Sequence, residues 1–366
     1  DLHRRRHSFP TRRSSDLLLS IICLCSFSAI QAQKSDDHRV IVIMTDGFRW
    51  QEVFGGVDSS IVKVKRFHHG DSANIIKNYW APELNARREK LLPFFWKTIA
   101  KKGQLHGNRS LGSLVNVANP YWFSYPGYSE LLTGQVDTAV NSNEYLPNPN
   151  TNFFEYLNGL SAYKGSVAAF GAWDAFDRIL NEKRAGFPVI NGYDDYHAYA
   201  QTQSSELLSR MTKESFRAFG EVEVLDNYMH FQAMDYLKNK KPKAMFISYG
   251  ETDEFAHEGH YGHYLNAAHQ FDAWLSEIWN FVESDPLYKG KTTLLITTDH
   301  GRGDKIKAQW TSHGDKVKDC HEIWYAMIGA KVTALAEVKS AEQVYQRELI
   351  HKVSALMGLN FQSIKK

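Results

Sequence analysis

Cysteine is scarce in this chain, which limits the covalent crosslinks that the protein could form. The 366 residues contain three cysteines, and Cys23 and Cys25 both lie within the first 32 residues. Cys320 is the only cysteine in the remaining sequence, so we expect no intramolecular disulfide there. An exported protein without disulfides fits a bacterial periplasm better than a eukaryotic secretory route.

The chain also lacks a large excess of charge of either sign. Its 43 Lys and Arg residues against 41 Asp and Glu give a formal net charge of +2. Five arginines and two aspartates lie within residues 1–32, so the remainder carries a net charge of −1. This balance does not favour binding to nucleic acid or to an anionic membrane surface.

Long apolar runs are absent as well. The apolar run at residues 17–30 has 14 residues, whereas a membrane-spanning helix needs about 20. It follows a basic segment and ends in Gln-Ala-Gln, which is the pattern of a secretory signal peptide. The stretch up to about residue 17 resembles a translated sequencing adapter. We therefore predict that residues 1–32 are a leader, with a non-native start followed by a signal peptide. We expect an exported protein, periplasmic or secreted, without a stable membrane anchor.

What the sequence does contain is the composition of a folded domain, with 43% hydrophobic and 13% aromatic residues and no internal repeat. Five short apolar runs predict strands at residues 39–44, 166–170, 244–249, 292–298 and 323–328. Segments with helical patterns lie between them, at residues 92–101, 129–132, 153–157, 226–237 and 264–283. This alternation predicts an α/β fold with a mostly parallel central sheet sandwiched by helices.

Two stretches break the alternation of strands and helices. Residues 55–88 are polar and irregular, and we expect a surface excursion there. Residues 174–223 are rich in Gly, Asn, Tyr and charge, and we interpret them as a loop-rich insertion or cap. We predict that residues 38–366 form a single catalytic domain that carries this insertion.

Acidic side chains follow three of the predicted strands. Asp46 follows the first strand and Asp253 follows the third. Asp299 and His300 follow the fourth. Ligands of open α/β sheets bind beyond the carboxyl ends of the strands. Any one aspartate could be a helix N-cap, but the set together predicts a site at one edge of the sheet.

Two further histidines extend this candidate site. His257 lies four residues after Asp253, so a helical turn would place both on one face. His313 lies in a Thr-Ser-His-Gly loop that can fold back over the same edge. A mixture of Asp and His suits Zn²⁺ or Mn²⁺. We interpret three neighbouring histidines as surface or supporting residues: His260, His263 and His269.

A serine ahead of a short helix supplies a candidate nucleophile. Ser124 precedes Pro126, a short helical segment and Gly134, which places it at or just before a helix N-terminus. Unpaired backbone N–H groups and the helix dipole favour an anion at such a position. A serine hydroxyl on a metal ion there loses its proton more readily and can attack as a nucleophile.

In this order, the motifs resemble those of the alkaline phosphatase superfamily, which includes phosphatases, nucleotide pyrophosphatase/phosphodiesterases, phosphonate hydrolases and arylsulfatases. The resemblance covers roughly residues 39–330 and rests on five motifs: Asp46-Gly-Phe-Arg, Ser124-x-Pro ahead of Leu-Leu-Thr-Gly, Asp253 with His257, Asp299-His300-Gly, and His313.

The resemblance implies a site for two divalent metal ions, Zn²⁺ or Mn²⁺. One ion would be held by Asp253, His257 and His313. The other would be held by Asp46, Asp299, His300 and Ser124. The resemblance further implies a hydrolase of small-molecule phosphate mono- or diesters that forms a covalent intermediate on Ser124.

Two departures from the superfamily motifs bear on the substrate. Sulfatases carry an arginine two residues after the proline, where this chain has Tyr128, which favours a phosphate over a sulfate ester. Phosphodiesterases often have an asparagine directly after the proline, where this chain has Gly127. That branch also has a later asparagine that binds a substrate oxygen, a role that Asn143 or Asn141 could fill.

No lysine or arginine has a firm position for clamping a phosphate. Arg49 is close to Asp46 in sequence, and Lys183 and Arg184 lie in the 174–223 insertion. Each fits a solvated surface charge better than a clamp. Among the aromatic residues near the nucleophile, Tyr125 suits an apolar or planar leaving group or the core. The candidate substrate-binding residues are Arg49, Tyr125 and Gly127.

Three alternatives stay open beside the phosphate ester hydrolase. A sulfatase would need the arginine that Tyr128 replaces. A phosphomutase relative would need a phosphosugar clamp and a cytoplasmic location, against which the leader argues. A binding protein without turnover would have no reason to retain the whole set of ligands and the nucleophile. The sequence identifies neither the natural substrate nor the oligomeric state.

Overall fold

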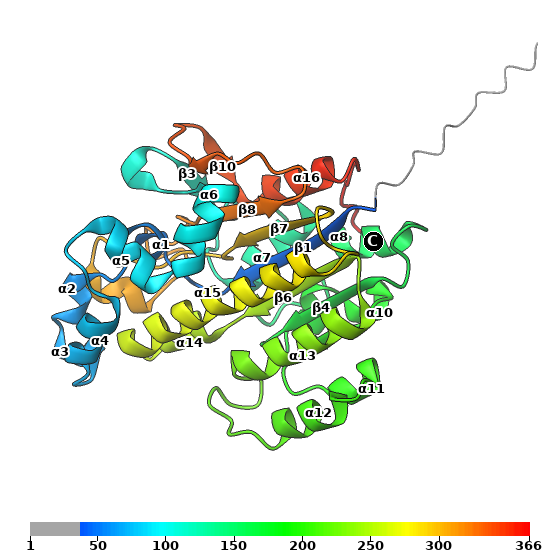
Figure 1. Ribbon diagram of the computed structural model, residues 1–366, viewed down its shortest axis with the longest axis horizontal. Coiled ribbons are helices and arrows are strands. Elements are labelled where there is room, and N and C mark those ends of the chain that lie inside the picture. The colour runs from blue at the N-terminus through cyan, green and yellow to red at the C-terminus, as the bar shows by residue number, and fades with distance from the viewer. Residues whose placement is uncertain (1–36) are drawn as a thin grey trace, which may run out of the picture. The chain divides into compact units, whose positions relative to one another are not determined.

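The five predicted strands form the centre of an eight-stranded sheet (Figure 1). The structure is a computed structural model that describes residues 37–366, and the strand order is β5-β4-β6-β1-β7-β8-β2-β9. A separate parallel pair is formed by β3 and β10. The strands are β1 (Arg39–Thr45), β2 (Gln104–His106), β3 (Leu114–Asn116), β4 (Val167–Gly171), β5 (Val189–Asn191), β6 (Ala244–Tyr249), β7 (Thr292–Thr297), β8 (Tyr325–Gly329), β9 (Ala336–Glu337) and β10 (Gln343–Tyr345).

The pairing within the large sheet is mostly parallel. β1 lies between β6 and β7 and pairs with both of them in parallel. β4 pairs in parallel with β5 and β6, whereas β8 runs antiparallel to its neighbours β7 and β2. The α/β fold with a mostly parallel sheet flanked by helices is therefore confirmed.

Helices connect the strands and cover both faces of the sheet. They are α1 (Trp50–Gly55), α2 (Ser59–Val62), α3 (Lys65–His68), α4 (Ser72–Tyr79), α5 (Leu84–Leu91), the π-helix η1 (Phe95–Ile99), α6 (Ala100–Lys102), the 3₁₀-helix η2 (Arg109–Leu111), α7 (Ser124–Thr133), α8 (Phe153–Gly159), α9 (Phe176–Ile179), α10 (Glu182–Ala185), α11 (Tyr196–Ala200), α12 (Ser205–Lys213), α13 (Asp226–Lys240), α14 (Glu251–His257), α15 (Tyr261–Ser284), the 3₁₀-helix η3 (Lys307–Thr311) and α16 (Gln346–Leu356).

Alternate side chains of β1 enter two different hydrophobic clusters. Ile41 and Ile43 belong to the cluster that includes α13 and α15. Val42 and Met44 belong to the cluster that includes α7, α8 and α16. Because successive residues of a strand point to opposite faces, a strand that is apolar throughout is buried on both sides. This explains why β1 is a continuous apolar run.

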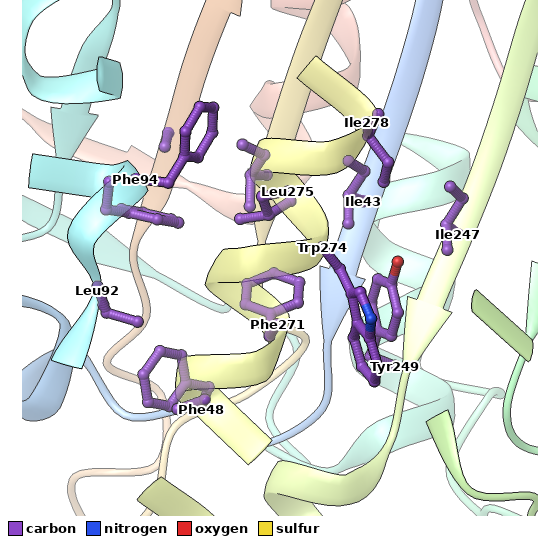
Figure 2. Close-up of a cluster of buried hydrophobic side chains, with 14 of the residues drawn as sticks. Ile43, Phe48, Leu92, Phe94, Ile247, Tyr249, Phe271, Trp274, Leu275 and Ile278 are labelled. Atoms are coloured by element: carbon purple, nitrogen blue, oxygen red, sulfur yellow. The ribbon is translucent and has the colours of Figure 1, made fainter. Parts of the chain in front are cut away.

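The longest helix, α15, packs along one face of the sheet. Figure 2 shows Phe271, Trp274 and Ile278 of this helix beside Ile43 of β1 and Ile247 of β6. Its buried residues recur at helical spacing. Each fully buried side chain of this size contributes about 1.5–3 kcal/mol by leaving water, so the helix holds β1 and β6 firmly in place.

Two predicted helix boundaries shift because of proline. α7 begins at Ser124, five residues before the predicted start, since Pro126 lies in the first turn, where its missing N–H would have no partner in any case. The helix predicted at residues 92–101 begins at Pro93 and continues as η1 from Phe95. Leu92, with φ −127° and ψ 70°, separates it from α5, because the residue before a proline disfavours helical geometry.

The two stretches expected to be irregular contain regular structure. Residues 55–88 include α2 to α4 and the start of α5, and residues 174–223 include α9 to α12 and β5. β5 pairs in parallel with β4, so part of the 174–223 segment extends the sheet. These elements have 3 to 9 residues each. Such short elements show too few turns for a hydrophobic period to be visible.

The described residues 37–366 all belong to one compact unit, and its description as a single catalytic domain stays a prediction. Among the described residues, every helix falls short of the length or the apolar composition that crossing a membrane would require. The predicted leader at residues 1–32 lies outside the described residues.

A buried carboxylate on α15 anchors the segment that follows Pro93. Asp272 accepts hydrogen bonds from the backbone N–H groups of Phe94 at 2.7 Å and Phe95 at 2.9 Å. Burial raises the pKa of Asp272 to about 7, while the two N–H groups act in the opposite direction. The carboxyl group is therefore more acidic in the unfolded chain than in the folded one.

We expect Asp272 to make the folded chain less stable as the pH rises from about 4 to about 7. Because the folded state binds this proton more tightly, the contribution is present below the unfolded pKa and is lost as the pH rises through the folded pKa. The free energy of unfolding should fall by up to about 4 kcal/mol from this group.

Asp272→Asn should remove this slope of unfolding free energy against pH, measured by urea unfolding of the metal-free protein between pH 4 and pH 8. Glu206→Gln, an exposed change on α12, should keep it; an equal slope in wild type and Asp272→Asn contradicts the assignment.

Candidate active site

The carboxyl ends of β1, β6 and β7 bring the predicted acidic residues to one edge of the sheet. Asp46 follows β1, Asp253 lies in α14 just after β6, and Asp299 follows β7. His300 lies among them: its Nε2 is 3.2 Å from Asp46 Oδ1, 3.4 Å from Asp299 Oδ2 and 3.8 Å from Asp253 Oδ1. The parallel pairing of β1 with both neighbours produces this convergence.

The other two predicted histidines adjoin this group. His257 Nε2 lies 2.9 Å from Asp253 Oδ2 and 2.9 Å from His313 Nε2. The His313 ring stacks on His300 with 4.0 Å between ring centroids. The structure therefore brings together the whole predicted set of carboxylates and imidazoles. His260, His263 and His269 lie in or next to α15 and make other contacts.

Two sets of donor atoms are close enough to hold a metal ion: Asp253 with His300 and His313, and Asp46 with Asp299 and His300. Within residues 37–366, Asp46 Oδ1 and Asp299 Oδ2 are buried without a hydrogen-bond partner. Buried polar atoms normally have a partner, so these two oxygens fit a bound cation. The site thus supports divalent metal binding.

The charges of the site shift the protonation of its members. Burial and then the Asp46 carboxylate raise the pKa of Asp299 well above its usual range. Burial alone would lower the pKa of His300, but the Asp299 and Asp46 carboxylates raise it to about 9. Three carboxylates and one imidazolium at such distances form a group that a divalent cation can neutralise.

Arg302 contacts the candidate metal ligand Asp253, although the sequence motifs did not indicate it. It is buried, and its guanidinium donates to Asp253 Oδ1 and to the carbonyl oxygens of Trp310 and Thr311. Burial opposes ionisation of Asp253, but Arg302 and the nearby histidines hold the pKa of that carboxyl well below its usual range. Its position three residues after Asp299 is the only sequence pointer to this role.

Ser124 lies where the motif predicts it, as the first residue of α7. Its Oγ is 3.5 Å from His300 Nε2. Asn143 lies beside it, because Asn143 Oδ1 accepts a hydrogen bond of 3.0 Å from the backbone N–H of Tyr125. Ser124 and Asn143 therefore line the same pocket as the candidate metal ligands.

This pocket has a volume of about 170 Å³. It is lined by Asp46, Ser124, Asn143, Trp173, Val222, Glu223, Gly250, Asp253, Glu254, His257 and His313. Burial and then the Glu254 carboxylate raise the pKa of Glu223 well above its usual range. The sequence motifs did not indicate Trp173, which directly precedes the 174–223 segment, or Glu223, which ends it.

Two predicted substrate-binding residues lie outside this lining. The Tyr125 hydroxyl donates to the carbonyl oxygens of Leu146 at 2.8 Å and Arg178 at 3.0 Å. Gly127 packs on the metal-site loop, where a Cβ would collide with the carbonyl oxygen of Asp299. The absence of a side chain at Gly127 therefore lets α7 approach that loop closely.

Arg49 is neither a surface charge nor part of the pocket lining. Its side chain is 0% exposed, its guanidinium pairs with Glu52, and Nη1 donates to the carbonyl oxygen of Gly303 at 3.0 Å. Glu52 also accepts from the Tyr261 hydroxyl at 2.9 Å. The expectation of a solvated charge is wrong, because α1 and the loops around it cover the arginine. Arg184 likewise pairs with Glu155 at 2.9 Å.

We expect Arg49→Met to lower the free energy of unfolding by about 3–5 kcal/mol, because it leaves the Glu52 carboxylate buried without its cation. Urea unfolding at pH 7.5 measures the change. Lys63→Met, at an exposed position, is the control and should stay within about 0.5 kcal/mol of wild type. A variant of unchanged stability whose KM for a phosphate ester rises would instead make Arg49 a substrate clamp.

Tyr128 supports a candidate metal ligand. The residue is fully buried, and its hydroxyl donates to Asp46 Oδ2 at 3.0 Å and accepts from Ser248 Oγ at 2.8 Å. It lies four residues after Ser124, so one helical turn places both on the same face of α7. The tyrosine that replaces the sulfatase arginine thus orients Asp46.

We expect Tyr128→Phe to weaken divalent-metal binding by about 10- to 100-fold, because residues that orient a metal ligand contribute to affinity in this range. Competition with a chromophoric chelator for Zn²⁺ measures the affinity. Tyr125→Phe, on the same helix but bonded elsewhere, is the matched control. Equal affinities of the two variants would remove Tyr128 from this role.

Known proteins share this arrangement of elements. A family model described as the metalloenzyme superfamily matches residues 221–355. That range contains Asp253, His257, Asp299, His300 and His313. A search of curated protein sequences gives no significant match.

Several solved structures have a similar fold. The lipoteichoic acid synthase LtaP from Listeria monocytogenes has a TM-score of 0.56 at 10% identity, over 89% of this chain and 73% of that one. Wild-type alkaline phosphatase PafA has a TM-score of 0.56 at 8% identity, over 90% and 97% of the two chains. Murine ectonucleotide pyrophosphatase/phosphodiesterase 5, solved in complex with AMP, has a TM-score of 0.51 at 12% identity, over 88% and 96%. The fold and the family model confirm the resemblance inferred from the motifs.

Proposed function

From the alkaline phosphatase superfamily fold of this chain and the donor atoms at its sheet edge, we propose that the protein is a metal-dependent hydrolase of small phosphate mono- or diesters. The observation that carries the proposal is the position of Ser124. Its hydroxyl lies at the start of a buried helix, 3.5 Å from His300 Nε2 and beside two groups of candidate metal ligands. The similar fold solved with AMP supports a small phosphate ester as substrate.

Seven residues would hold two divalent ions, Zn²⁺ or Mn²⁺. Asp253, His257 and His313 would hold one ion. Asp46, Asp299, His300 and Ser124 would hold the other. When bound, such ions neutralise the negative charge of a transferring phosphoryl group.

The residues of the chain then divide the chemistry between them. Ser124 Oγ gives up its proton to solvent and attacks phosphorus, and the bond from phosphorus to the leaving oxygen breaks. That oxygen keeps both electrons of the bond and takes up a proton from solvent to become the alcohol. Water then attacks the seryl phosphoryl ester, the Oγ–P bond breaks, and the serine hydroxyl is restored. The net reaction consumes one water and releases the alcohol and a phosphate. Asn143 Oδ1 already accepts from Tyr125, so its Nδ2 would donate to a phosphoryl oxygen.

The surroundings of Tyr128 support a phosphate rather than a sulfate ester. Sulfatases need an arginine at this position to convert the nucleophile to formylglycine. Here the tyrosine is buried and bonded to Asp46, so the position serves the candidate metal site. An unmodified Ser124 is accordingly the proposed nucleophile.

We expect Ser124→Ala to lower kcat/KM for p-nitrophenyl phosphate or bis-p-nitrophenyl phosphate by at least about 10³-fold, because the attacking atom is removed. The assay uses the purified chain with Zn²⁺ or Mn²⁺. Ser110→Ala, an exposed serine outside the pocket, should retain full activity.

Three results would contradict parts of the proposal. Inertness toward both phosphates and p-nitrophenyl sulfate, unchanged by Ser124→Ala, removes the hydrolase. Turnover of the sulfate alone, with a mass change at Ser124, replaces it with a sulfatase. A metal content of no more than one ion per chain removes the pair of ions.

A further inference from the structure

Two carboxylates of the pocket lie outside the candidate metal ligands. Glu223 and Glu254 line the pocket beside Asp46 and Asp253, but neither belongs to the two groups of donor atoms. Glu223 is only 7% exposed, and within the described residues its Oε1 has no hydrogen-bond partner. A buried carboxyl group without a partner costs folding free energy. A ligand that binds in the pocket would supply the partner that Glu223 lacks.

The backbone leaves space for this carboxylate. A Cβ at Gly250 would overlap Glu223 Oε1. The φ angle of Gly250 is −115°, which any residue adopts, so the glycine is needed for space and not for backbone conformation. The loop after β6 is therefore shaped to accept the Glu223 carboxylate at the pocket wall.

Trp173 lies next to Glu223 through an antiparallel bridge. The bridge is flanked by hydrogen bonds from Asp174 N to Val222 O at 2.8 Å and from Val224 N to Ala172 O at 3.0 Å. Side chains directly opposite each other in such a pair lie on the same face, and both of these line the pocket. An indole ring beside a carboxylate is a favourable environment for an organic cation.

The charge of the pocket also favours a cation as the partner of Glu223. A phosphate ester is an anion, and Glu223 and Glu254 in their ionised forms would repel it unless a cation lay between them. Among the described residues that line the pocket there is no lysine or arginine. The cation must come from the substrate or from a further metal ion. The Trp173 ring offers no metal ligand but attracts an ammonium group, which favours the substrate.

We propose that Glu223, Trp173 and Glu254 form a subsite for an ammonium group on the alcohol that is esterified to the substrate phosphate. The inference rests on the proposed function and narrows its substrate class to phosphate esters of amino alcohols, including quaternary ones. Such a substrate is a zwitterion: the two candidate ions meet its phosphate, and the glutamates meet its cation.

Two matched esters test this subsite. p-Nitrophenyl phosphorylcholine and p-nitrophenyl 3,3-dimethylbutyl phosphate differ only in the replacement of N⁺ by carbon. The ratio of their kcat/KM values on the metal-loaded full chain should favour the cationic ester by about 10- to 100-fold. Glu223→Gln and, separately, Trp173→Leu should each lower that ratio by about tenfold or more. Glu221→Gln, an exposed change two residues away, should keep the wild-type ratio.

The possible outcomes test the ammonium subsite separately from the proposed hydrolase function. A wild-type ratio near one, or a ratio that both variants preserve, overturns the subsite while the hydrolase stands. Loss of one bound metal ion per chain in Glu223→Gln assigns the carboxylate to a metal and overturns it as well. If neither ester is cleaved, the proposed function fails, and calorimetric binding of choline against 3,3-dimethylbutanol decides the subsite. Tighter choline binding that Glu223→Gln weakens tenfold supports it, and equal binding of the two alcohols overturns it.

Discussion

The parallel pairing of β1 with β6 on one side and β7 on the other is the constraint on which the site depends. The register aligns Thr45 with Tyr249 and Met44 with Thr297, so the three strands end at the same level. The residues that come next along each strand therefore meet, although Asp46 is more than 200 positions from Asp253 and Asp299 in the chain. Both faces of these strands are covered by helices, and a one-residue slip in register would move every side chain of a strand to the opposite face of the sheet.

Bringing three carboxylates together has an electrostatic cost that the fold meets in stages. Arg302 pairs with Asp253, and the imidazole of His300 lies between Asp46 and Asp299. Two carboxylate oxygens still have no hydrogen-bond partner among the described residues. The negative charge that Arg302 and His300 leave unbalanced gives the site its capacity for divalent cations, because metal ions would offset the remaining repulsion.

The pocket is lined by residues from two different parts of the fold. The candidate metal ligands lie at the ends of the central strands, and these strands belong to the part of the fold that the similar structures have. Trp173 and Glu223 come instead from the two ends of the segment that carries β5, where an antiparallel bridge joins them. In the proposed function, chemistry and substrate choice thus come from different parts of the chain. A change in the segment between these ends could alter the substrate without disturbing β1 and its neighbours.

The sequence by itself determined the central strands, the order of the candidate ligands and the position of Ser124 at a helix start. These properties follow from local patterns: continuous apolar runs, the spacing of Asp253 and His257, and a proline in the first turn. Only the tertiary structure decided which polar residues are buried and what they contact. Arg49 proved to be paired in the interior, and Tyr128 bonds an aspartate 82 residues away. Burial and partners over such separations depend on how the elements pack, which no local pattern encodes.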